Sequence, residues 1–110
     1  MVINSSPFGS RSRTTVLLAL RLMDGSHARE LARVLSIPLT GVQQALRGLE
    51  KDGLVAATPA GRTRVYRINP RYFAIEALKG YLSRLVEPEE ELRGCIEGMR
   101  RRPRKAGKPL

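Results

Sequence analysis

Polar side chains of an unusual kind recur on one side of a predicted helix in the stretch IPLTGVQQALRGLEKDGLV, residues 37–55. The apolar residues of this stretch have helical spacing and predict its buried face: Val42, Ala45, Leu46 and Leu49. The opposite face carries amides and an arginine where an ordinary solvated helix carries mostly Glu and Lys: Thr40, Gln43, Gln44 and Arg47. Amide and guanidinium groups form paired hydrogen bonds, so this face has the chemistry to bind a flat polar edge.

The edges of DNA bases in the major groove offer such partners. Glutamine can pair with N6 and N7 of adenine, arginine with O6 and N7 of guanine, and the threonine methyl can contact the methyl group of thymine. We therefore interpret Thr40, Gln43, Gln44 and Arg47 as residues that read bases in double-stranded DNA. The alternative is an exposed polar face without a partner. For Leu39, at the start of this helix, contact with thymine and packing on a neighbouring helix are both open.

Two shorter helices are predicted ahead of this one, over residues 11–23 and from an N-cap at Ser26 to about residue 35. Pro38 is tolerated at a helix start, so the third helix begins near it and ends at Gly53. The second and third helices are then joined by a few residues, which is the spacing of a helix-turn-helix. The buried residues predicted for the first two helices are Val16, Leu17, Leu20, Met23, Ala28, Leu31, Ala32 and Leu35.

A β-hairpin is predicted after Gly53, because LVAAT (residues 54–58) and RVYRI (residues 64–68) are β-prone and the segment PAGRT between them is a turn signal. The predicted turn, residues 59–63, places Arg62 at the tip. Arg62 and Arg64 would then lie along the minor groove or its phosphates. The alternatives are a solubilising tip for Arg62 and packing against the sheet for Arg64. Further arginines on the first two helices are candidates for phosphate contacts that fix register without reading sequence: Arg11, Arg13, Arg29 and Arg33.

Two helices are predicted in the C-terminal part, one capped by Asn69 with Pro70 at its first position, and one from Pro88 to about Arg101. Their apolar stripes exceed what one short helix needs, which favours a homodimer interface, although an intramolecular core is the alternative. The interface residues expected are Ile75, Leu78, Leu82, Leu85, Leu92 and Ile96, with Phe73, Ala77 and Tyr81 widening the first stripe and Cys95 and Met99 on the buried face of the second.

The charge balance of the chain supports an anionic partner. Its 110 residues carry 20 Lys and Arg against 10 Asp and Glu, a formal net charge of +10. Nucleic acid, an anionic membrane surface and an acidic protein all fit this balance, and nucleic acid is favoured. A single cysteine indicates a reducing compartment, and neither a signal peptide nor a membrane span is expected, so we expect a cytoplasmic, nucleoid-associated protein.

No enzyme chemistry is indicated by the motifs. The chain shows no Ser/His/Asp set, no paired carboxylates and no glycine-rich phosphate loop, and HARE (residues 27–30) lacks the second histidine of a metalloprotease motif. His27 is expected to be an ordinary exposed residue, and no metal or other cofactor is expected. Cys95 is expected to be a small core residue, with a disulfide across a two-fold axis as the alternative role.

The stretches ELARVLSIPLTGVQQALRGLEKDGLV and GRTRVYRINP, within residues 11–86, resemble the ArsR-type branch of bacterial winged helix-turn-helix regulators, while MarR-like regulators share much of the pattern. The resemblance implies a mainly α fold with a small β-wing, and terminal helices that form a homodimer. Metal sensing by paired cysteines is not implied, because HARELA has none and residues 72–85 contain no histidine. Pro38 stands where such families often place a serine cap.

We therefore expect a homodimeric transcriptional regulator that binds a specific DNA sequence, by default as a repressor. Two alternatives remain: a protein-interaction module, and an architectural protein that binds DNA without sequence preference. The operator, an effector and the regulated genes do not follow from the sequence. The predicted organisation is a flexible arm (residues 1–10), a winged helix-turn-helix domain (11–70), C-terminal helices (71–102) and a disordered basic tail (103–110).

Overall fold

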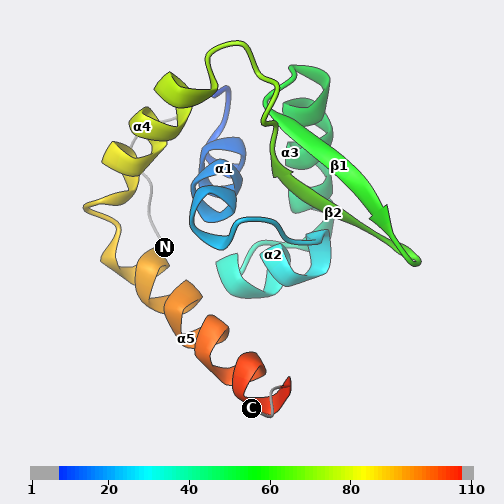
Figure 1. Cartoon of the computed structure of the whole chain (residues 1–110), viewed down its shortest axis with the longest axis vertical. Helices are drawn as coiled ribbons and strands as arrows, with labels where there is room; N and C mark the ends of the chain where they lie inside the picture. Colours follow the sequence, from blue (N-terminus) through cyan, green and yellow to red (C-terminus); the bar gives the residue numbers. More distant parts are fainter. Residues whose placement is uncertain (1–7, 108–110) are drawn as a thin grey trace.

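The computed structural model describes the backbone of residues 8–107 and the side chains of residues 8–98. In this part of the chain one helix, α1, lies in the centre, with a two-stranded wing projecting on one side and two helices along the other (Figure 1). The elements in chain order are α1 (Arg11–Met23), α2 (Ala28–Leu35), α3 (Leu39–Lys51), β1 (Val55–Ala60), β2 (Thr63–Ile68), α4 (Ile75–Val86) and α5 (Glu90–Gly107).

Helix α1 is buried around most of its circumference, which explains its central place. Every residue from Thr14 to Leu20 is buried, and the helix packs against α3, α4, β2, α5 and α2. The sequence VLLAL supplies this all-round apolar surface, while the Thr14 and Thr15 hydroxyls donate to backbone carbonyls four residues earlier. Both predicted bounds of this helix are confirmed. Ser10 caps its first turn, because the Ser10 Oγ accepts a hydrogen bond from the Arg13 N–H at 3.1 Å.

Helices α2 and α3 form the predicted helix-turn-helix, but the cap of α2 differs from the prediction. His27 is the N-cap, and its Nδ1 accepts from the Glu30 N–H at 3.2 Å. Ser26 is wrong as the cap, because its backbone pairs with Tyr66 of β2 and its buried hydroxyl is hydrogen-bonded to Glu30 Oε1. The same contacts show that His27 is half-buried and structural, not an ordinary exposed residue.

Helix α3 starts after Pro38 without a side-chain cap, as predicted, and is followed by Gly53 with φ +83°. The predicted stripe of Val42, Ala45, Leu46 and Leu49 is buried. Leu39, at the start of the helix, is half-buried.

The wing is a regular antiparallel hairpin with a shorter turn than predicted. Ala60 pairs with Thr63, which leaves Gly61 and Arg62 as the two turn residues, and Pro59 and Thr63 belong to the strands. Gly61 has φ +66°, as the first central residue of a type II′ turn requires. The backbone of Ser26 pairs with Tyr66, with N···O distances of 2.9 and 2.7 Å, so the α1–α2 link fixes the wing at the start of α2.

Helix α4 begins at Ile75, so the predicted cap at Asn69 and first position at Pro70 are wrong. The Asn69 side chain is used differently. Its Nδ2 donates to the Gly53 carbonyl at 3.0 Å and its Oδ1 accepts from the Arg71 N–H, which ties the end of the wing to the end of α3. Residues 70–74 then form turns.

Helix α5 begins at Glu90 and its backbone continues to Gly107. The end of this helix differs from the predicted end near Arg101, and the helical backbone of residues 103–107 differs from the predicted disordered tail. Residues 108–110 of the predicted tail, residues 1–7 of the predicted arm and the side chain of Met99 lie outside the described part. Within that arm, Phe8 is half-buried against the core, its ring centroid 6.1 Å from that of Tyr81, so residues 8–10 are ordered.

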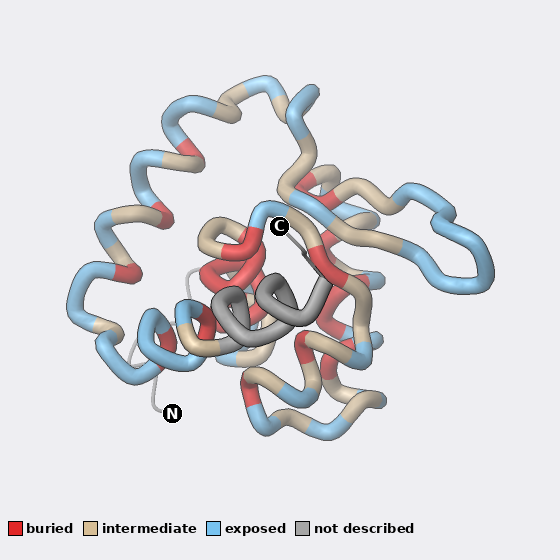
Figure 2. Tube along the Cα trace, turned by 60° about the horizontal axis from the view of Figure 1, so that its bottom comes forward, coloured by how far each residue is buried: buried red, intermediate tan, exposed pale blue. Residues whose placement is uncertain are grey.

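The apolar stripes of α4 and α5 pack mainly inside the protomer. Leu78, Leu82, Leu92 and Ile96 are all less than a tenth exposed within the single chain, where these helices face α1 and α2 (Figure 2). This burial by α1 and α2 favours the intramolecular core that the sequence left as the alternative, and the dimer interface stays a prediction. Ile75 and Leu85 are half-buried. Cys95 is exposed, which corrects its predicted place on the buried face.

Candidate nucleic-acid interface

The outer face of α3 carries the predicted base-reading residues together. Thr40, Gln43, Gln44 and Arg47 are all exposed, and the opposite face of the same helix is buried against α1, α2 and β1. None of the four side chains has a hydrogen-bond or ion-pair partner among the described residues. Packing therefore fixes the helix and leaves its amide and guanidinium groups free to meet a ligand.

The wing stands beside α3 and holds its two arginines differently. Arg62 is exposed in the turn at the end of the hairpin, as predicted. Arg64 pairs with Glu50 of α3 at 3.3 Å and lies over the Tyr66 ring, with 5.7 Å between the Arg64 Cζ and the ring centroid. Such a partly exposed ion pair contributes up to about 1 kcal/mol, so it orients the wing on α3 but leaves Arg64 able to exchange partners.

The arginines predicted to contact phosphates fall into two groups. Arg11, Arg29 and Arg33 are exposed. Arg13 is engaged inside the protein: it pairs with Asp52 at 3.4 Å, and its guanidinium lies over Gly48, where a Cβ atom would come within 2.7 Å of the Arg13 Nε. The absence of a side chain at Gly48 thus allows Arg13 to join α1 to the end of α3. Arg13 is thus not a free surface cation in this structure, and its contact with phosphate stays a prediction.

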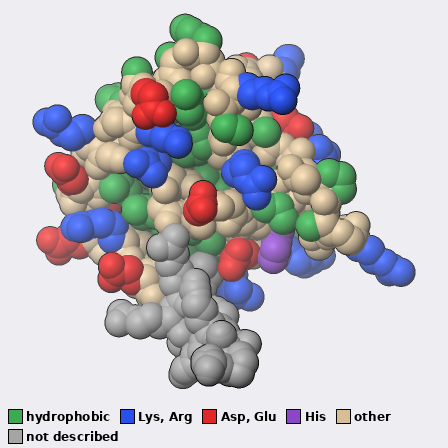
Figure 3. Space-filling view, in the orientation of Figure 1, with side chains coloured by type: hydrophobic (Ala, Val, Ile, Leu, Met, Phe, Trp, Pro, Cys, Tyr) green, Lys and Arg blue, Asp and Glu red, His purple; other side chains and the backbone are tan. Residues whose placement is uncertain are grey.

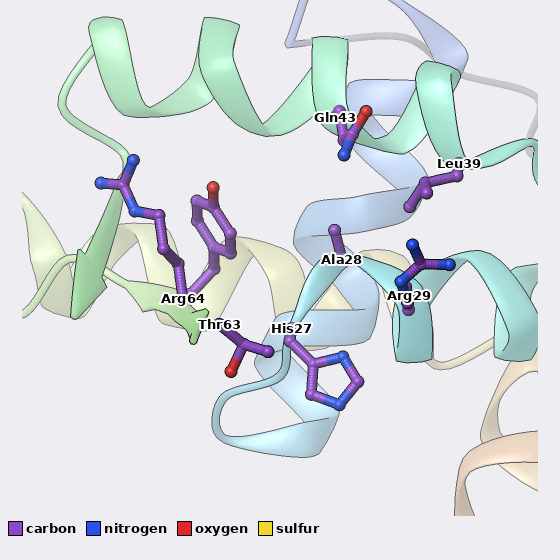
Figure 4. Close-up of a pocket in the computed structure, with 8 residues that line it drawn as sticks. His27, Ala28, Arg29, Leu39, Gln43, Thr63 and Arg64 are labelled. Atoms are coloured by element: carbon purple, nitrogen blue, oxygen red, sulfur yellow. The ribbon is translucent and has the colours of Figure 1, made fainter. Parts of the chain in front are cut away.

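A cleft of about 260 Å³ lies between the start of α2, the start of α3 and the wing. Gln43 extends towards it from α3, Ala28 and Arg29 line it from α2, and Thr63 and Arg64 come from β2 (Figure 4). The cleft thus joins residues predicted for base reading, for the wing and for phosphate contact, which lie far apart in the sequence. A strand of nucleic acid crossing between α3 and the wing would pass over it.

His27 and Thr63 also line this cleft, and the sequence interpretation missed both. Because the His27 Nδ1 accepts a hydrogen bond, the neutral ring carries its hydrogen on Nε2, which is free to donate. The signal available in the sequence was position: His27 stands directly before a helix, and Thr63 directly after a glycine-containing turn. The His27 Nε2 therefore adds a donor to the edge of the cleft, while the Thr63 hydroxyl donates to the Ala60 carbonyl at 3.1 Å and can accept a hydrogen bond there.

On the face shown in Figure 3, Lys and Arg side chains are scattered among Asp and Glu side chains, and one basic side chain stands at the end of the projecting wing. Residues 8–98 contain no cluster of His, Cys, Asp and Glu side chains that could hold a metal ion. In the same described portion of the chain, no helix has the length and apolar character needed to cross a membrane.

The structure contains a helix-turn-helix, and the second helix of this motif presents a free polar face. A two-stranded wing follows it, and this combination defines the winged helix-turn-helix class of DNA-binding proteins. The model of the MarR family matches residues 10–64, which is half of the chain and includes α1, α2, α3, β1 and the start of β2. The chain therefore belongs to the MarR family of DNA-binding transcriptional regulators, which is not a family of enzymes. Regulators of this family bind DNA, typically as dimers. No curated protein matches the chain.

Solved structures with a similar fold include regulators from two bacteria. A double mutant of Lactococcus lactis ZitR in the apo form matches with 21% identity and a TM-score of 0.52, covering 73% of this chain and 64% of that one. The Adhesin competence repressor, AdcR, from Streptococcus pyogenes matches with 18% identity and a TM-score of 0.52, covering 90% and 83%. A single mutant of ZitR gives 18% identity, a TM-score of 0.52 and coverage of 98% and 82%. These likenesses show the fold, and the chain spans less than two thirds of the ZitR double mutant.

The ArsR-type assignment is not supported, since the matching family model is that of MarR. The resemblance rested on the apolar stripe of the helix-turn-helix and on the wing. These features pack in the same way in ArsR-type and MarR-type regulators. They predicted the winged fold correctly but did not separate one branch from the other.

Proposed function

We propose that this protein is a homodimeric repressor that binds a pseudo-palindromic site in double-stranded DNA. The observation that carries the proposal is the outer face of α3, where amides and a guanidinium are exposed on a helix fixed by its buried side. Many polar side chains can contact phosphates, but amide and guanidinium groups such as those of Gln43, Gln44 and Arg47 can also form bidentate bonds with base edges. In this proposal residues 11–70 bind DNA, and the exposed wing and α2 arginines fix its register.

Replacement of Gln44 or Arg47 by alanine tests base reading. Each variant should bind the preferred site more weakly by roughly 1–3 kcal/mol, which is about 5- to 150-fold, because one bidentate base contact is lost. Binding to scrambled DNA at the same salt concentration should change little. We would select the preferred site from a random DNA pool and measure both affinities by fluorescence anisotropy.

The matched control is Arg33→Ala, which removes an exposed arginine from α2. It should weaken binding to both DNA sequences alike, because a phosphate contact carries no sequence information. All variants should melt near the temperature of the unmutated protein, since alanine favours a helix at exposed sites. Equal losses on both DNA sequences for Arg47→Ala and Gln44→Ala would reject base reading, and a pool without an enriched sequence would support the architectural or protein-interaction rivals.

The proposed dimer uses the part of α4 that remains exposed. Phe73, just before α4, is 91% exposed and Tyr81 is 46% exposed, the large apolar side chains that stand out on the described surface. Ala77 lies between them at helical spacing and is also exposed. A second copy packed against this face would cover the aromatic rings and place two copies of α3 on one DNA, as a two-fold dimer requires.

Tyr81→Glu together with Ala77→Glu should convert the dimer into a monomer, because like charges would meet across the two-fold axis and would lose water there. Sedimentation equilibrium at micromolar concentration measures the mass, and circular dichroism checks the fold. Arg33→Glu is the control, since it adds the same charge on α2. A monomeric mass for the unmutated protein, or a dimer that survives both Glu substitutions, would contradict the proposed interface.

A further inference from the structure

A second pocket, of about 180 Å³, lies where the end of α1, the end of β2 and the first half of α4 meet. It shares no lining residue with the cleft beside α3. Leu20, Ile68 and Pro70 provide apolar walls, and the remaining lining residues carry charge: Arg21, Asp24, Arg67 and Lys79. A water molecule occupies about 30 Å³ in the liquid, so the pocket has room for an ion of about five non-hydrogen atoms.

The cations of this pocket come from separate elements, and within residues 8–98 none of them forms an ion pair with the Asp24 that shares the pocket. Arg21 of α1 donates from Nε to the Lys79 carbonyl at 3.4 Å, which orients the guanidinium and leaves its terminal nitrogens available. Arg67 of β2 lies over the α1–α2 link, its Nη2 3.6 Å from where a Cβ atom of Gly25 would be. Within residues 8–98, the ion pairs of the structure involve neither Arg21, Arg67 nor Lys79.

Like charges gathered in one pocket repel one another, and an anion bound between them removes that repulsion. Asp24 contributes one negative charge at the rim, so the lining side chains carry an excess of positive charge. Arginine forks bind carboxylate and phosphate oxygens in pairs, and a lysine adds a point charge. The pocket therefore has the charge, the donors and the volume that a small oxyanion needs.

We propose that this pocket binds a small free oxyanion of the phosphate or carboxylate type, held by Arg21, Arg67 and Lys79. The ion joins α1 and the wing to α4, so binding fixes α4 on the winged part of the molecule. This site does not depend on the DNA-binding proposal, because its ligand is a free ion.

Calorimetric titration of the full chain tests the site without DNA, using inorganic phosphate and acetate as probes at an ionic strength kept constant with sodium chloride. At least one probe should bind with a stoichiometry of one per chain. Arg67→Gln and Lys79→Gln should each raise its Kd about 10- to 100-fold, because a hydrogen bond to a charged group is lost. Arg84→Gln, which removes an exposed cation of α4 outside the pocket, is the matched control and should leave the Kd nearly unchanged.

Asp24→Asn gives a change of opposite sign. Asp24 has φ 62°, a left-handed conformation that asparagine adopts readily, so the fold should tolerate the substitution. Removing the carboxylate should tighten oxyanion binding by up to about fivefold, the scale of an exposed charge interaction. Failure of both probes to bind, or equal weakening by Arg84→Gln, would overturn the proposal.

DNA phosphate offers the same chemistry, and a separate arm distinguishes the two sources. DNA affinity is then measured in a buffer without phosphate or carboxylate. If the ligand is a free ion, Arg67→Gln and Arg84→Gln should reduce the affinity for DNA by similar amounts. A larger loss for Arg67→Gln would identify the pocket as a DNA backbone contact and overturn the proposal, whether or not α3 reads bases.

Discussion

Replacing Leu82 by alanine should lower the free energy of unfolding by roughly 2–5 kcal/mol, which lowers the melting temperature by about 10 °C or more. Leu82 is fully buried in the protomer, on the side of α4 that faces α1. The substitution removes buried methyl groups and leaves a cavity that the well-fixed α1 cannot fill. Thermal unfolding followed by circular dichroism measures the change.

The neighbouring residue provides a control on the same helix. Tyr81 is 46% exposed, so Tyr81→Ala removes a larger side chain but opens no core cavity. Its melting temperature should fall much less, and any fall should depend on protein concentration if Tyr81 supports the dimer. The opposite result, a normally stable but monomeric Leu82→Ala variant, would return Leu82 to the dimer interface that the sequence predicted.

The helix-turn-helix and the wing could be predicted because their signals are local. The all-apolar run of α1, the stripe of α3, Pro38 at its start and Gly53 at its end each restrict the backbone within a few residues. The free polar face of α3 followed directly, because a helix with one buried face must expose the other. The exposure of Gln43, Gln44 and Arg47 is therefore predictable without tertiary information.

The errors arose where a local signal had a distant partner. Asn69 followed by Pro70 has the pattern of a helix start, but the Asn69 amide bonds to Gly53 and α4 begins later. Arg13 has the pattern of a free surface cation, but α3 offers Asp52 and a side-chain-free Gly48 to receive it. Such partners are set by the packing of helices that are far apart in the sequence.

Which chain covers an apolar stripe is also a tertiary property. The spacing of Leu78 and Leu82 shows that one face of α4 is buried, but periodicity does not tell whether α1 of the same protomer or a second copy covers it. Cys95 shows a related effect on α5, where Leu92 and Ile96 are buried and the intervening Cys95 is exposed. A stripe drawn from apolar character alone is wider than the face that packing uses.

The salt dependence of DNA binding should be the largest effect of all. A dimer that neutralises roughly 6–10 phosphates should lose about 10³- to 10⁵-fold in affinity between ~50 and ~200 mM salt, because each neutralised phosphate releases condensed counterions. The exposed arginines of the wing and α2 are available for these contacts, namely Arg62, Arg29 and Arg33, together with Arg11 of α1. Anisotropy titrations at a series of salt concentrations give the slope of log affinity against log salt.

Two variants separate the phosphate contacts from base reading within that slope. Arg62→Gln should make the slope shallower by about 1 for each arginine lost, which is about 2 for the proposed dimer, and should weaken binding to every sequence alike. Gln44→Ala removes an uncharged side chain, so it should lower affinity for the preferred site at each salt concentration and leave the slope unchanged. If Arg62→Gln leaves the slope intact, the wing tip does not contact a phosphate, and the DNA must run along α3 without reaching the end of the hairpin. If the slope of the unmutated protein is near zero, electrostatic attraction by the net charge of +10 is not what holds this protein on DNA.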